Sequence, residues 1–179
     1  MGGALAVHAV HSNRMDAVVG LGVIDVVEGS AMESLSVMGV VINSRPKHFA
    51  SVEGAIKWCI EMGMARNMRA ARISMPSQIT QDDSGRGFKW RTDLHKTQPY
   101  WVGWFKGLSK MFLECSPPKI LILAGVDRLD TDLTVGQMQG KFQNTILPKV
   151  GHAVQEDSPD KLADTLARFA VRFRFCTSK

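Results

Sequence analysis

The sequence contains few cysteines and no long hydrophobic run. Its 179 residues include three scattered cysteines, Cys59, Cys115 and Cys176, which form no Cys-x-x-Cys pair. An odd number of separated thiols argues against a disulfide framework and favours a reducing compartment, so we expect an intracellular protein, cytoplasmic, nuclear or both. No segment approaches the roughly 18 consecutive apolar residues of a membrane span. Residues 1–8 have no basic segment ahead of their apolar stretch, so we expect neither a membrane protein nor a signal peptide.

The sequence also lacks a concentrated basic patch and a metal-binding pattern. Its 22 lysines and arginines and 17 acidic residues give a net charge of +5, and this charge is spread thinly along the chain. A nucleic-acid-binding protein concentrates such charge beside exposed aromatic residues, so we expect no nucleic-acid partner. Four histidines, His8, His11, His48 and His95, show no metal-ligand spacing with a second ligand. We therefore expect no metal and no cofactor.

Three short segments rich in apolar residues are typical of parallel strands buried on both faces of a sheet. They cover residues 18–24, 119–124 and 143–150. Helical patterns precede the first segment, at residues 1–12, and follow the second and third, around residues 129–141 and at residues 158–173. With 45% hydrophobic residues, this alternation predicts an α/β fold in a single domain over residues 1–179.

Residues 27–116 interrupt this alternation and predict a helical insertion. Residues 31–42 and 52–62 have helical patterns, whereas residues 76–89 are rich in turn-forming residues and predict a flexible loop. An aromatic group follows that loop; its members are Trp90, Tyr100, Trp101, Trp104 and Phe105.

Polar side chains stand where the predicted strands end. Asp25, Asp127 and His152 each follow a strand, and in open α/β sheets sites form at the carboxyl ends of the strands. The order of a strand followed by Asp and a later strand followed by His matches the acid and base of an α/β-hydrolase triad, whose chain order is Ser, then Asp or Glu, then His. No Gly-x-Ser-x-Gly motif occurs in the 179 residues, so the nucleophile serine is absent from this sequence.

Several long segments are similar to signatures of the protein phosphatase methylesterases, and the similarity covers essentially the whole chain. These segments are residues 24–32 (IDVVEGSAM), 99–109 (PYWVGWFKGLS), 123–130 (LAGVDRLD), 135–143 (VGQMQGKFQ) and 151–157 (GHAVQED). The resemblance implies the C-terminal part of an α/β-hydrolase fold with a helical lid. It also implies a serine esterase that removes the methyl ester from the C-terminal leucine of the type 2A protein phosphatase catalytic subunit.

The resemblance further implies roles for individual residues. The family's nucleophile lies in Gly-His-Ser-Met-Gly-Gly, and the chain begins Met1-Gly2-Gly3. We therefore expect the chain to start just after the serine, to contribute one oxyanion-hole donor through the backbone of Met1, and to be inactive alone. His152 would be the general base. General hydrolase topology favours Asp127 as its partner, whereas the family uses the acid that corresponds to Asp25, and we favour Asp25.

The aromatic group has two interpretations: it forms the lid's own small core, or it contacts the phosphatase, whose C-terminal tail must enter the crevice. Two alternatives to a truncated esterase also stay open. The chain could be a non-catalytic module that binds the phosphatase through its lid, or a partial gene model. The predicted loop at residues 77–89 looks shorter than expected for the family, which puts partner contacts by that loop in doubt.

Overall fold

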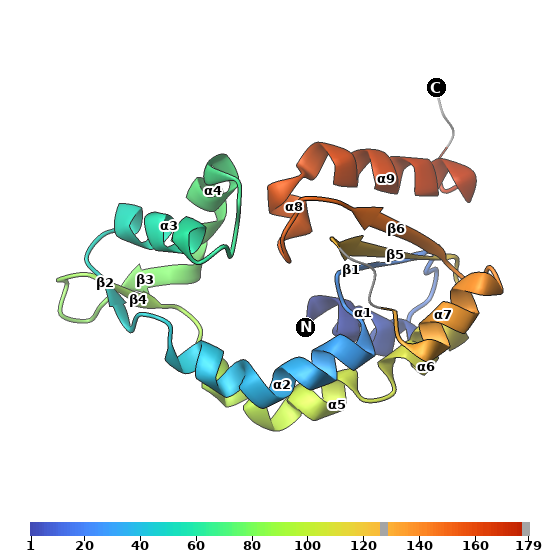
Figure 1. Cartoon of the computed structure of the whole chain (residues 1–179), viewed down its shortest axis with the longest axis horizontal. Helices are drawn as coiled ribbons and strands as arrows, with labels where there is room; N and C mark the ends of the chain where they lie inside the picture. The colour runs from blue at the N-terminus through green and yellow to red at the C-terminus, as the bar shows by residue number, and fades with distance from the viewer. Residues whose placement is uncertain (126–128, 177–179) are drawn as a thin grey trace.

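A three-stranded parallel sheet forms the centre of the molecule (Figure 1). The computed structural model describes residues 1–125 and 129–176. The strands lie in the order β1-β5-β6, with bounds β1 Leu21–Ile24, β5 Lys119–Ala124 and β6 Gln143–Leu147. Strand β5 pairs with both neighbours, and its first five residues are buried. Burial on both faces explains why the strand has no polar alternation in its sequence.

Helices cover both faces of this sheet, which confirms the predicted α/β class (Figure 1). Leu121 and Leu123 of β5 share an apolar core with one group of helices, namely α1 (Gly2–His11), α6 (Leu108–Glu114) and α7 (Thr131–Met138). Ile120 and Ile122 share a second core with α8 (Val154–Asp157) and α9 (Pro159–Arg172). Successive strand residues point to opposite faces, so one strand supplies both cores. We call these elements the body.

A second, smaller unit lies beside the body and has its own core (Figure 1). We call residues 48–90 the outer unit; its elements are β2 (His48–Phe49), α3 (Val52–Glu61), α4 (Met68–Gln78), β3 (Ile79–Gln81) and β4 (Phe88–Trp90). Its strands form an antiparallel sheet in the order β2-β4-β3. Buried Phe49, Ala55 and Met75 belong to its core.

Helical segments join the outer unit to the body. Helix α2 (Glu28–Asn43) leads out of the body directly after β1. The chain returns through the 3-10 helix η1 (Leu94–Tyr100) and through α5 (Trp101–Phe105), both of which contact α2 (Figure 1). The two connections therefore run side by side.

Most predicted elements are confirmed, but the flexible loop at residues 76–89 is wrong. Strands β3 and β4 pair there in antiparallel register, with Ile79 opposite Trp90 and Gln81 opposite Phe88. The turn-forming residues form a turn only between the two strands. There Gly85 has a φ of +69°, and the Asp82 N–H donates to the Gly87 carbonyl at 2.8 Å. Three-residue strands are too short to show a clear periodicity in sequence.

Candidate active site

Asp25 is fixed at the carboxyl end of the sheet by its neighbouring strand. Its backbone N–H donates to the Ile122 carbonyl at 2.7 Å, and its carboxylate Oδ1 accepts from the Ala124 N–H at 2.8 Å. Its φ of +51° lies in the left-handed region, which Asp tolerates better than most residues. The strand therefore ends in a sharp turn that aims the second oxygen, Oδ2, away from the sheet.

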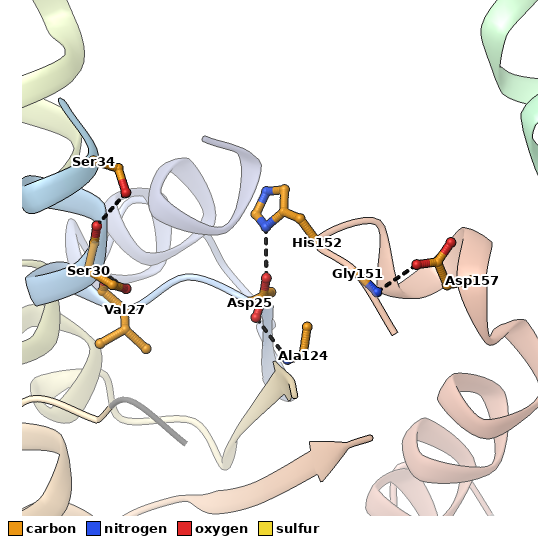
Figure 2. Close-up of polar contacts among 8 residues, drawn as sticks. All are labelled: Asp25, Val27, Ser30, Ser34, Ala124, Gly151, His152 and Asp157. Carbon is orange, nitrogen blue, oxygen red and sulfur yellow. Dashed lines mark hydrogen bonds and ion pairs between the residues drawn. The ribbon is translucent and has the colours of Figure 1, made fainter. Parts of the chain in front are cut away.

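His152 meets this oxygen from the loop that follows β6. The ring Nδ1 lies 2.8 Å from Asp25 Oδ2 (Figure 2). An ionised carboxylate only accepts hydrogen bonds, so Nδ1 carries a proton and, in the neutral ring, Nε2 keeps its lone pair. The Asp25 side chain is 21% exposed and that of His152 is 79% exposed, so the acid is sheltered and the base faces solvent. This arrangement suits an imidazole that exchanges protons through Nε2.

A cavity of about 560 Å³ lies beside the pair. Its lining includes Asp25, His152 and Met1 together with apolar side chains such as Leu35, Met38 and Phe105. Leu35 and Met38 lie on α2, which begins just after Asp25. Sequence reasoning missed Leu35 and Met38 because their helical spacing resembles that of ordinary core residues.

Met1 reaches this cavity because α1 approaches β1 closely. A Cβ at Gly3 would lie 3.0 Å from Cγ1 of Val23 and 3.3 Å from Cγ2 of Val26. The absence of a side chain at Gly3 therefore lets the first turn of α1 pack against the end of β1. This close approach is specific to Gly3, because a Cβ at Gly2 would have no neighbour within 4 Å.

Two serines also line the cavity, but their hydroxyls donate hydrogen bonds to nearby backbone carbonyls. Ser30 Oγ donates to the Val27 carbonyl at 3.4 Å, and Ser34 Oγ donates to the Ser30 carbonyl at 2.7 Å. Figure 2 places both on α2, separated from His152. These are the usual bonds of serines within helices. In the described structure neither hydroxyl bonds to His152, so neither occupies the position of an activated nucleophile.

The five aromatic residues of the insertion lie in different surroundings. Trp90 packs edge-on against Phe49 and Trp58 in the outer unit, with ring centroids 5.3 and 5.5 Å away. Trp101 is buried in α5, whereas Tyr100 is 63% exposed. Trp104 and Phe105 pack against the body's first core, and of the five only Phe105 lines the described cavity. The alternative acid Asp127 lies outside the described residues.

The described part of the chain offers neither a metal-binding cluster nor a membrane-spanning helix. Within residues 1–125 and 129–176, no group of three or more His, Cys, Asp or Glu side chains could hold a metal ion. No helix in these ranges is long and apolar enough to cross a membrane.

A strand-end acid paired with a histidine after a later parallel strand is the arrangement of α/β-hydrolases. The model of the alpha/beta hydrolase family matches residues 1–165. The chain belongs to this family. Two solved structures share the fold. E-2-(acetamidomethylene)succinate hydrolase has a TM-score of 0.76 and 17% identity, over 94% of this chain and 63% of that chain. A Mycobacterium tuberculosis esterase has a TM-score of 0.64 and 22% identity, over 91% of this chain and 58% of that chain.

Curated hydrolases of this family are much closer in sequence. The chain is 59% identical to the probable protein phosphatase methylesterase 1 of Caenorhabditis elegans, over 100% of this chain and 49% of the relative. It is 44% identical to protein phosphatase methylesterase 1 of Homo sapiens, over 98% of this chain and 56% of the relative. The resemblance found in the sequence is thereby confirmed. The chain spans about half the length of these curated relatives.

Proposed function

We propose that the chain carries the acid and the base of a serine esterase that demethylates a protein phosphatase. The observation that carries this proposal is the 2.8 Å bond between His152 Nδ1 and Asp25 Oδ2 beside a cavity, in a chain 59% identical to a protein phosphatase methylesterase. The substrate in this proposal is the methyl ester on the C-terminal leucine of the type 2A phosphatase catalytic subunit, as the family resemblance implies.

In the first half of the reaction, His152 Nε2 takes the proton of a serine hydroxyl as the serine oxygen attacks the ester carbonyl. The bond from the carbonyl carbon to the methoxy oxygen then breaks. His152 gives its proton to this oxygen, so methanol leaves and an acyl-serine remains. Asp25 keeps the ring in the tautomer with a proton on Nδ1 and stabilises the imidazolium that forms.

In the second half, His152 takes a proton from water, whose oxygen attacks the acyl carbonyl. The serine oxygen leaves with the proton returned by His152, and the product is the free C-terminal carboxylate. The 179 residues contain no Gly-x-Ser-x-Gly motif, so this scheme needs a serine that they do not supply. When a residue precedes Met1, the peptide N–H of Met1, which lines the cavity, is the proposed donor to the oxyanion.

The apolar part of the cavity supports a substrate that ends in leucine. Leu35, Met38 and Phe105 present aliphatic and aromatic surface within the same cavity as His152. Burial of a leucine side chain against such surface contributes about 1.5–3 kcal/mol to binding. We assign the part of residues 27–116 that precedes α6 the role of a lid, in which Phe105 contacts the substrate and exposed Tyr100 is available to the phosphatase.

The test joins the part of the C. elegans relative that precedes the matched region to Met1 of this chain, and we call this protein the chimera. We expect the chimera to release methanol from methylated phosphatase and this chain alone to give no turnover above buffer. His152→Gln should abolish release by the chimera, and Asp160→Asn, an exposed substitution on α9, should not.

Rapid hydrolysis by this chain alone, or labelling of one of its serines by a fluorophosphonate, would contradict the scheme. A chimera that binds the phosphatase in a pull-down but releases no methanol would instead favour the non-catalytic binding module.

A further inference from the structure

One carboxylate connects the outer unit to the loop that carries His152. Asp157, the last residue of α8, accepts the Gly151 N–H on Oδ2 at 2.6 Å and the Arg66 N–H on Oδ1 at 2.6 Å. Gly151 directly precedes His152, and Figure 2 shows its bond to Asp157 beside the histidine. Arg66 belongs to the outer unit and lies just before α4. The two bonds therefore join segments that are far apart in the sequence.

The neighbouring carboxylate reaches the same unit. Glu156 Oε2 accepts the hydroxyl of Ser74, which lies in α4, at 2.8 Å. Helices α4 and α8 also pack against each other. Glu156 and Asp157 are both half-buried, so the two contacts are partly shielded from water. Hydrogen bonds to an ionised carboxylate are about twice as strong as those between neutral groups.

The backbone at Gly151 is closely surrounded by the partners of this contact. A Cβ placed on Gly151 would lie 3.0 Å from Asp157 Oδ2 and 3.4 Å from Arg66 Nε. There is thus little room for a side chain between the His152 loop, the carboxylate and Arg66. The position of Asp157 consequently limits where the backbone before His152 can lie.

We propose that Asp157 is a positioning residue for His152 and that Asp157 and Glu156 form a latch between α8 and the outer unit. The importance of this for catalysis rests on the proposed function, in which His152 is the base. The side chain of His152 is largely exposed, so packing does little to orient it, and its bond to Asp25 depends on where its backbone is held. Through the shared carboxylate of Asp157, a shift of the outer unit is transmitted to that backbone.

The test uses the full chain labelled with ¹⁵N in its histidine rings and, separately, in its backbone. His152→Gln assigns the ring signals of His152. We expect the wild-type ring to show a protonated Nδ1, and Asp157→Asn to move the pattern toward a protonated Nε2, because an amide cannot accept both N–H groups. Hydrogen exchange at Gly151 and Arg66 should rise about tenfold.

Asp160→Asn is the matched control, because it removes the same charge from the exposed first turn of α9. It should leave the ring signals and both exchange rates unchanged. A folded Asp157→Asn variant with wild-type ring signals and exchange rates would overturn the proposal.

A second variant keeps the proposal falsifiable if Asp157→Asn does not fold. Ser74→Ala removes only the bond to Glu156, and we expect it to raise exchange at Arg66 about threefold in an otherwise intact spectrum. An unchanged rate would contradict the latch. None of these measurements needs turnover, so the two proposals can fail independently. An inactive chimera would not contradict the latch, and an active chimera would not support the latch if the exchange rates stayed unchanged.

Discussion

The body and the outer unit differ in how their cores are built. In the body, alternate residues of β5 fill two cores, and Ile120 and Ile122 are fully buried. In the outer unit, strands of two or three residues share one core with two helices. Asp25 and His152 lie on the body, and the contacts of α8 described above connect the outer unit to the loop that carries His152. The body thus carries the proposed acid and base, and we expect the outer unit to open more readily than the body.

The largest expected loss of stability comes from a substitution in the core of the body. Ile120→Ala should reduce the free energy of unfolding by about 2–5 kcal/mol, because it leaves a cavity between β5 and α9 that neighbouring side chains fill only partly. Chemical denaturation followed by circular dichroism measures this loss.

Ile73→Ala is the matched control for this substitution, since Ile73 is 74% exposed on α4. It should change the free energy of unfolding by less than about 0.5 kcal/mol. Equal losses from both substitutions would contradict the burial on which the comparison rests.

Met75→Ala removes the largest fully buried side chain of the outer unit. We expect this substitution to destabilise the outer unit locally and to affect the body much less. Burial raises the pKa of the thiols of Cys59 and Cys115, and the charge of Glu156 raises that of Cys59 further. Both thiols therefore react with a thiol reagent only when their surroundings open. In a Cys176→Ser background, Met75→Ala should accelerate labelling of Cys59 at least about tenfold and leave that of Cys115 nearly unchanged.

Mass spectrometry of the labelled peptides distinguishes the two sites. Parallel acceleration at Cys59 and Cys115 would show that the outer unit and the body unfold together, which would remove the difference drawn between them.

The parts predicted from sequence are those that local patterns determine. The apolar run at residues 119–124 is typical of a buried strand, so strand β5 could be predicted. Asp25 directly follows another such strand, so its place at the end of the sheet could be predicted as well. The hairpin of β3 and β4 was missed because its strands are very short. The role inferred for Asp157 depends on Arg66, which is 91 residues away in the chain, and no local pattern reports such a contact. Long-range hydrogen bonds of this kind become visible only in the folded structure.

The central claim, that Asp25 orients His152 as the base of an esterase, is tested most directly by the kcat of the chimera with Asp25→Asn. An asparagine keeps the size of the side chain but stabilises neither the tautomer with a protonated Nδ1 nor the imidazolium. We predict that kcat falls about 10³–10⁴-fold with little change in KM, while Asp160→Asn stays within about twofold of the unsubstituted chimera. A kcat for Asp25→Asn within about tenfold of the unsubstituted chimera would contradict the assignment of Asp25.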